Sequence, residues 1–296
     1  MAEAIVTNRL TKRYGELAAL DGLDLMVRKG EILGYLGPNG SGKTTTIRLL
    51  LGMITPTTGS ASIFGLDVQT QQAAVHRQVA YVPGEANLWP FLTGYETLEL
   101  LANVHGSVDK PYRDELIRRF ALEPHKKVRA YSKGNKQKVA LIAALATRAE
   151  LLILDEPTSG LDPLMEQAFR EAVREAKANG QTVFLSSHIL EEVEALCDRV
   201  AVLRAGKLVE QGTLEQLRHL SAVTVTATFA GKPPAVGHIA GVDNVTMHKN
   251  RLTCQVHGSI DPLLGALAKA HPVQLLSTEP SLEELFLSLY GDAEAR

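Results

Sequence analysis

The chain has 296 residues and is 45% hydrophobic, enough for one large core or for a large core with a smaller domain, and we expect two unequal domains. The net charge of −2 argues against a protein that binds nucleic acid or an anionic membrane over its whole surface. The two cysteines, Cys197 and Cys254, lie far apart and exclude a disulfide framework and a zinc knuckle, so we expect a reducing cytoplasm.

The N-terminal segment and the apolar runs bear on a role at a membrane. Residues 1–15 mix acidic and basic side chains and contain no apolar run, so we do not expect a secretory signal. A helix that spans a bilayer needs about 20 apolar residues, and the most apolar helix-like run, Val139 to Ala146, is too short. If the protein works at a membrane, another chain must span it.

From Ile5 to about Leu220, short apolar runs alternate with helix-like segments, which is typical of an α/β sheet with crossover helices. The predicted strands are Leu23 to Val27, Ile32 to Leu36, Val79 to Val82, Leu151 to Leu154, Thr182 to Ser186 and Arg199 to Leu203. Further helices are predicted over Thr93 to His105, Tyr112 to Phe120 and Ser132 to Thr147. We therefore predict an α/β domain over residues 1–220, with a helical subdomain inserted at about 88–148.

After Leu220 the pattern changes to a different domain. Residues 222–229 alternate as a half-buried strand does, and a hairpin with its turn near Lys249-Asn250 is followed by an apolar helix from Ile260 to Ala270. A final amphipathic helix is predicted from Pro280-Ser281, with an apolar face of Leu282, Leu285, Phe286 and Leu289. We predict that residues 221–296 form a small α+β domain with an accessory or dimerisation role.

Three possible metal ligands occur in this second domain. His248, Cys254 and His257 have odd and even spacings that place them on different faces of their strands. A shared chelate needs its ligands on one side, so we predict no metal site there.

Residues 37–44 read GPNGSGKT and match the pattern GxxxxGK[ST] between the strand Ile32 to Leu36 and a helix predicted over Thr45 to Leu51. Glycines allow backbone N–H groups to converge on phosphate oxygens, and the helix N-terminus adds partial positive charge. Lys43 would neutralise the β and γ phosphates during catalysis, and the Thr44 hydroxyl would bind Mg²⁺. The predicted nucleotide-binding residues of this segment are Gly37, Pro38, Asn39, Gly40, Ser41, Gly42, Lys43, Thr44 and Thr45.

A pair of carboxylates follows the apolar strand Leu151 to Leu154. Ligands bind at the ends of strands in α/β sheets, so Asp155 suits a second Mg²⁺ ligand and Glu156 is placed to polarise an attacking water. Alone, an acidic pair at a strand end is equally typical of a solvated turn. Together with the phosphate loop it indicates nucleotide hydrolysis.

The segment LLILDEPTSGLDP at 151–163, the segment SKGNKQ at 132–137 and Ser186-Ser187-His188 together resemble the nucleotide-binding subunit of an ATP-binding cassette (ABC) transporter. The resemblance covers about Ile5 to Leu220, and the ordered set of motifs separates this family from other P-loop folds. It implies a P-loop NTPase of the ABC type, with a mixed sheet core and an inserted helical subdomain. It also implies that the protein is an ATPase with ATP and Mg²⁺ as cofactors.

The resemblance assigns further roles. Tyr14 lies where the family places an aromatic side chain that stacks on adenine, although it also suits an ordinary tyrosine at a strand end. Ser132 and Gly134 match the signature loop, which in the family faces the γ phosphate of the nucleotide bound by the other subunit. The usual LSGGQ of that loop reads YSKGN here, so that Lys133 replaces a glycine and could add charge near the γ phosphate.

Two more segments match the family. Residues 159–162, which end in Asp162, match the loop that crosses the dimer interface, although a plain turn before a helix fits them locally. His188 matches the histidine that contacts the γ phosphate and holds Glu156 and the water in register. These assignments imply that two copies close head to tail on two ATP molecules and reopen after hydrolysis.

The partners follow from the same resemblance: a second copy of the chain and separate integral membrane permease subunits at the cytoplasmic side of the membrane, with no nucleic acid. The stretch PSLEELF at 280–286 resembles the tail of daunorubicin-resistance-type subunits, so we expect export of a drug, antibiotic or lipid-like compound. Alternatives are a soluble ABC-type ATPase that acts on a ribosome or nucleic acid, and a transporter that works in another direction. A P-loop kinase would leave the signature loop and His188 without a role.

The segment VAYVPGEANLWP at 79–90 departs from the family at one position. Most cassettes have glutamine where this chain has Gly84, and glycine has no side chain with which to touch Mg²⁺ or water. Glu85 could approach the metal, an ordered water could take the place of the amide, or Gly84 could act as a hinge; we favour the hinge with water. Trp89 lies where cassettes receive the permease, and it is either a core anchor or an exposed contact.

Overall fold

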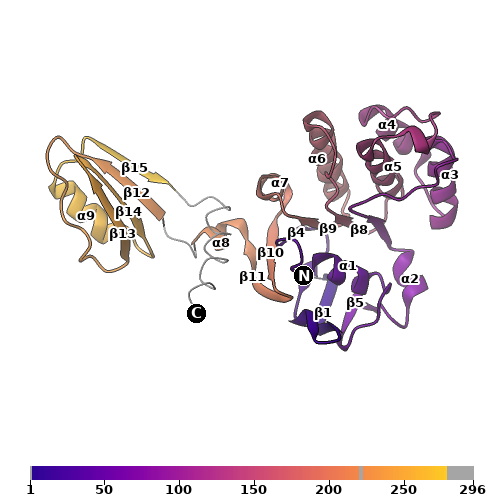
Figure 1. The fold of residues 1–296 in the computed structure, drawn as a ribbon, viewed down its shortest axis with the longest axis horizontal. Coiled ribbons are helices and arrows are strands. Elements are labelled where there is room, and N and C mark those ends of the chain that lie inside the picture. The colour runs from indigo at the N-terminus through magenta and orange to yellow at the C-terminus, as the bar shows by residue number, and fades with distance from the viewer. Residues whose placement is uncertain (1, 220–222, 279–296) are drawn as a thin grey trace. The chain divides into compact units, whose positions relative to one another are not determined.

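The computed structural model of the protein describes residues 2–219 and 223–278. The chain divides into two compact units, Met1–Gln211 and Gly212–Arg296. Figure 1 draws both units. The predicted functional division at residues 220 and 221 stays a prediction.

The first unit begins with an antiparallel sheet whose strand order is β2-β1-β5-β6. Its strands are β1 (Glu3–Tyr14), β2 (Leu17–Leu23), β5 (Thr58–Ile63) and β6 (Leu66–Asp67), and β3 (Met26–Arg28) also pairs with β1. The predicted strand from Leu23 to Val27 is wrong, because the chain breaks between β2 and β3. There the Thr7 hydroxyl donates to Leu23 O (2.7 Å) and accepts from Leu25 N (2.8 Å). These side-chain hydrogen bonds take the place of backbone hydrogen bonds between strands.

The second sheet of this unit carries the predicted phosphate loop. Its order is β11-β10-β4-β9-β8-β7, and the strands from β10 to β7 run parallel. The strands are β4 (Ile32–Leu36), β7 (Val79–Val82), β8 (Leu151–Asp155), β9 (Thr182–Ser187), β10 (Arg199–Arg204) and β11 (Lys207–Thr213). Every residue of β4, β8 and β9 is buried, as near-continuous apolar runs in a parallel sheet require. Their predicted positions are confirmed.

Helices cover this sheet and form the insertion. The insertion contains α3 (Gly94–His105), α4 (Lys110–Arg119) and α5 (Lys133–Ala146), which lie grouped in Figure 1 beside α6 (Pro163–Ala178). The other helices of this unit are α1 (Lys43–Leu50), α2 (Gln72–His76) and α7 (Leu190–Leu196), while α8 (Leu214–His219) belongs to the second unit. A capping box of Thr93 and Glu96 begins α3, and Ser132 caps α5. The three predicted helices of the insertion are confirmed within two residues at each end.

Over residues 223–278 the second unit is a four-stranded sheet with one helix on one face (Figure 1). The strands are β12 (Val223–Thr228), β13 (Val242–His248), β14 (Arg251–Val256) and β15 (Gln274–Thr278), and the helix is α9 (Asp261–Lys269). The predicted hairpin turn at Lys249-Asn250 and the predicted apolar helix are confirmed. Cys254 is fully buried in the core of this unit. The predicted final helix at 280–289 lies outside the described residues.

No helix within residues 2–219 and 223–278 is both long and apolar enough to cross a bilayer.

Candidate functional site

The phosphate loop occupies the turn between β4 and α1. Gly42 directly precedes α1 with φ of 113°, a left-handed conformation that side chains rarely adopt, and an added Cβ would lie 2.6 Å from the Ala19 carbonyl oxygen. Lys43 is 5% exposed, and its Nζ donates to Gly37 O (2.6 Å) and Pro38 O (3.3 Å). Burial lowers the pKa of Lys43 despite the carboxylates nearby.

The sheet brings Asp155 to the same place. Asp155 ends β8, and its Oδ1 accepts from the Ser186 hydroxyl (2.5 Å) while its Oδ2 accepts from the Thr44 hydroxyl (3.3 Å). Burial raises the pKa of Asp155, and the hydrogen bonds from Ser186 and Thr44 oppose that rise. One hydroxyl and one carboxylate are oxygen ligands of the kind that Mg²⁺ takes together with phosphate and water. The donor set at Thr44 and Asp155 therefore fits Mg²⁺.

Glu156 follows in an unusual backbone conformation. Its φ is 46°, and its amide donates to Ser186 O (3.0 Å) in the neighbouring strand. The Glu156 Oε1 lies 3.3 Å from His188 Nδ1 and 3.7 Å from Lys43 Nζ. A non-glycine residue in the left-handed region is strained, and such strain persists where the surroundings fix it, often at functional sites. Glu156 is thus held between the phosphate loop and His188.

A cavity of about 520 Å³ opens over the phosphate loop. It is lined by Tyr14, Leu17, Ala18, Ala19, Pro38, Asn39, Gly40, Gly42, Lys43, Thr44, Thr45, Glu156 and Ala205. Tyr14 is 49% exposed at the end of β1, and Lys12 Nζ lies over its ring, 5.1 Å from the ring centroid. Within the described residues the buried Ser41 hydroxyl has no hydrogen-bond partner, which leaves one polar group of the loop for a ligand.

Comparison with known proteins identifies the family. The family model "ABC transporter" matches residues 20–159. The daunorubicin resistance ATP-binding protein DrrA3 of Streptomyces coeruleorubidus is 35% identical over 98% of this chain and 96% of its own. The chain belongs to the ABC transporter family.

Solved structures agree with this ABC fold. A structure of the ATP-binding subunit of an ABC transporter is 35% identical, with a TM-score of 0.68 over 73% of this chain and 92% of that chain. The dimeric cassette MJ0796, a bacterial ABC transporter cassette, has a TM-score of 0.63 at 24% identity over 71% of this chain and 98% of that chain. The protein is thus an ABC transporter ATP-binding subunit, and its enzymatic activity is that of an ATPase.

The residues of the ABC signature loop do not join the cavity over the phosphate loop. Ser132 is the N-cap of α5 and accepts from Asn135 N (3.2 Å), while Asp162 is the N-cap of α6 and accepts from Met165 N (3.1 Å). Gly134 lies against the backbone of Gly160, where an added Cβ would be 2.3 Å from the carbonyl oxygen. None of these predicted nucleotide ligands lines that cavity.

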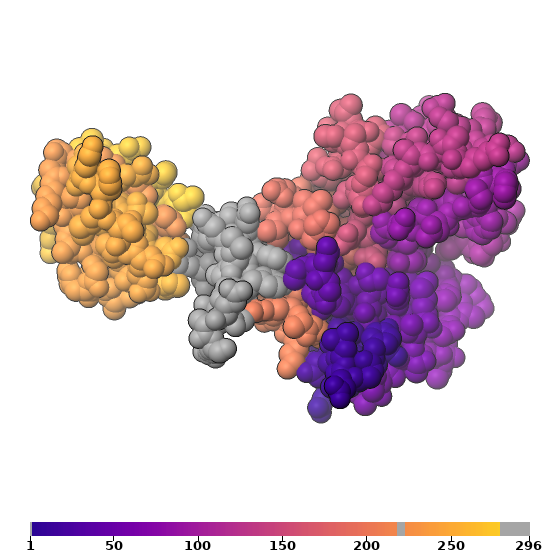
Figure 2. Space-filling view, in the orientation of Figure 1, coloured from indigo at the N-terminus to yellow at the C-terminus, as the bar shows by residue number. Residues whose placement is uncertain are grey.

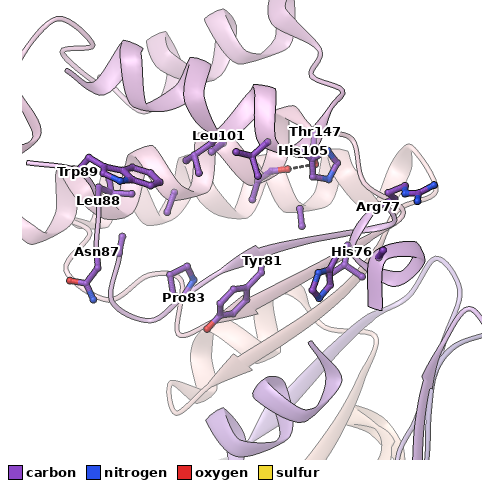
Figure 3. A pocket seen from close by; sticks show the side chains of 18 residues that line it. His76, Arg77, Tyr81, Pro83, Asn87, Leu88, Trp89, Leu101, His105 and Thr147 are labelled. Carbon is purple, nitrogen blue, oxygen red and sulfur yellow. Dashed lines mark hydrogen bonds between the residues drawn. The ribbon is translucent and has the colours of Figure 1, made fainter. Parts of the chain in front are cut away.

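A second cavity, of about 500 Å³, lies between α2, β7 and the helical insertion of the ABC subunit. We call it the insertion groove, and its lining includes Tyr81, Pro83, Trp89, Leu101, Ala140 and Ala144. Figure 3 shows the Trp89 ring beside the helix that carries Leu101, and Figure 2 shows a notch between the insertion and the purple segment below it. Trp89 is 48% exposed, so it is an exposed wall of the groove.

Sequence reasoning did not find every residue of this ABC site. Ser186 was noted only as part of a motif, although its hydroxyl holds Asp155, and Ala205 lines the nucleotide cavity with φ of 45°. Gln137, which is 1% exposed, donates from Nε2 to Pro83 O (3.0 Å) beside the Gly84 position. Gln137 stands in the polar first part of α5, between Lys136 and Lys138, so the sequence carries no local signal that it is buried.

Proposed function

We propose that this ABC subunit hydrolyses ATP at the phosphate loop to power export of a drug, antibiotic or lipid-like compound through separate permease subunits. The carrying observation is that three segments of the chain meet at the phosphate loop. Lys43, Thr44 and Glu156 line one cavity. Asp155 accepts from the Thr44 hydroxyl, and His188 Nδ1 lies 3.3 Å from the Glu156 carboxylate. The resistance function in the name of the daunorubicin relative supports the choice of exported compounds.

The proposed chemistry divides among these side chains. The Lys43 ammonium, which now donates to loop carbonyls, would turn to the β and γ phosphates and offset their charge. Glu156 would orient and polarise the attacking water, and His188 at 3.3 Å would hold the Glu156 carboxylate in that position. Thr44 and Asp155 would hold Mg²⁺, which offsets phosphate charge when bound.

We propose further that the site is completed by a second copy of the chain. Ser132, Gly134 and Asp162 do not line the cavity of their own chain, yet Ser132 is exposed at the N-terminus of a 14-residue helix. Such an end attracts anions, so it suits the γ phosphate in a head-to-tail dimer. The MJ0796 cassette has a dimeric structure, which supports a dimer of two such chains.

The insertion groove is our candidate contact for the permease at the cytoplasmic face of the membrane. Its lining is mainly apolar, and two large apolar side chains of that lining stand exposed: Trp89 (48%) and Val104 (78%). An exposed apolar concavity of this kind fits the apolar face of a helix from a partner chain.

Export is tested by complementation. In a strain that lacks the gene, the wild-type chain should lower accumulation of an amphipathic test compound such as daunorubicin, and Glu156→Gln should not. Trp89→Ala should keep ATP hydrolysis by the purified subunit yet lose export, because the groove is separate from the nucleotide cavity. Lys110→Met, at an exposed position on α4, is the control. Full export by Glu156→Gln would refute the proposal.

A further inference from the structure

Helix α5 touches both loops that flank the carboxylates Asp155 and Glu156. Its first residue, Lys133, reaches the loop that follows Glu156, and Gln137, one turn later, reaches the loop that follows β7. Because both contacts arise from consecutive turns of one helix, the two loops are fixed relative to each other.

The first contact joins Lys133 to the loop at 159–160. Lys133 Nζ donates to the Ser159 hydroxyl at 2.9 Å, and its methylene stem runs beside Gly160, about 3.5 Å from where a Cβ on that residue would lie. Gly134 lies directly on the Gly160 carbonyl and leaves no room for a side chain. The lysine that replaces a glycine in the signature loop is therefore already engaged within its own chain.

The second contact is buried. Gln137 is 1% exposed, and its Nε2 donates to Pro83 O at 3.0 Å. The next residue, Gly84, lies so near β8 that a Cβ there would be 3.2 Å from Asp155 O. Gln137 thus anchors to α5 the loop whose next residue, Gly84, lies beside Asp155.

Glu156 needs such support from both sides. Its φ of 46° is a strained conformation, and the turn that holds it closes through Ser159 N donating to Glu156 O at 3.1 Å. Ser159 is the residue that Lys133 holds, so release of the lysine would loosen that turn. A looser turn lets Glu156 relax and misplaces its carboxylate, which slows the chemical step more than it weakens nucleotide binding.

We propose that Lys133 and Gln137 are positioning residues that clamp the Glu156 turn from its two sides. The proposal rests on the proposed catalytic role of Glu156. Gly84 has no side chain that could link the insertion to the carboxylates. In this chain Lys133 and Gln137 of α5 make that link instead.

A double-mutant cycle in the full chain tests the exposed half of the clamp. The variants are Lys133→Met, which keeps the stem and removes the ammonium, Ser159→Ala, and the pair together. We expect each single change to lower kcat for ATP about fivefold, to leave KM within twofold, and the pair to be no worse than either one. Lys133→Arg should restore most of kcat, and Lys110→Met, also the first residue of a helix, should match the wild type.

Gln137→Met tests the buried half, with a larger expected loss of about tenfold in kcat and an unchanged KM. Should that variant fail to fold, the Lys133 and Ser159 cycle still decides the matter. If Ser159→Ala keeps the wild-type kcat while Lys133→Met lowers it, the lysine acts on the nucleotide and the clamp is overturned. The clamp is also overturned if the fold-losses in kcat of the two single variants multiply in the double variant. Glu156→Gln separates the two proposals: full turnover there refutes the catalytic role of Glu156, whereas inactivity there with unchanged clamp variants refutes the clamp alone.

Discussion

Gly134→Ala should damage the first unit, although alanine ordinarily stabilises a helix. Gly134 is the second residue of α5, and a Cβ there would lie 2.3 Å from the Gly160 carbonyl oxygen, where ordinary contact begins near 3.4 Å. The helix and the loop must therefore move apart by about 1 Å, since both obstructing atoms belong to backbone. Overpacking of this kind costs about 1–3 kcal/mol, or roughly 3–10 °C in the Tm of a unit of this size.

Gly265→Ala is the matched control. Gly265 lies within α9, and no atom lies within 4 Å of its added Cβ. Alanine there should gain up to ~1 kcal/mol of helix propensity, so the Tm of the second unit should rise by up to roughly 4–8 °C. Calorimetry on the full chain measures both transitions. The Gly134→Ala variant should also lose ATP turnover, because the displaced loop contains the residues that follow Glu156.

A Gly134→Ala variant with an unchanged or raised Tm and wild-type turnover would contradict this prediction. Such a result would mean that the close approach between α5 and the loop at 160 is absent in solution.

Three other predictions concern the metal site and pH. Glu85 is exposed, so Glu85→Ala should leave the Mg²⁺ dependence of ATP hydrolysis unchanged; a shifted Mg²⁺ half-saturation would make Glu85 a metal ligand after all. Burial raises the pKa of Asp155, and the hydrogen bond from the Ser186 hydroxyl lowers it. Ser186→Ala should therefore move the acid limb of the pH profile of kcat to higher pH. An unmoved acid limb would contradict this prediction. Burial raises the pKa of Tyr112 to about 12. Above about pH 10 the unfolded chain therefore loses this proton before the folded chain does, and the free energy of unfolding falls as the pH rises towards 12. Tyr112→Phe should lessen that fall in denaturant titrations at pH 11, and an equal fall in the variant would contradict the prediction.

The sequence predicts the local parts of this site well. The phosphate loop needs only a short spacing of glycines, lysine and threonine between a strand and a helix, and the structure has that arrangement. The buried strands β4, β8 and β9 are likewise visible as unbroken apolar runs.

The parts that the sequence does not predict depend on contacts across the chain. The antiparallel sheet of β1, β2 and β5 has a mixed polar pattern, and the break after Leu23 depends on the hydroxyl of Thr7. The bond from Gln137 to Pro83 spans 54 residues, and no local pattern encodes it. For the same reason, the match of Ser132 to the signature loop does not place it at the nucleotide cavity of its own chain.

The most direct test of the whole account is sedimentation of Glu156→Gln with and without ATP and Mg²⁺. This variant should bind ATP, barely hydrolyse it and sediment as a dimer only when ATP is present. His188→Ala, which leaves the carboxylate in place, should be slowed less. A variant that stays monomeric in saturating ATP, or that hydrolyses ATP at the wild-type rate, would contradict the central claim that Glu156 drives hydrolysis within a two-chain site.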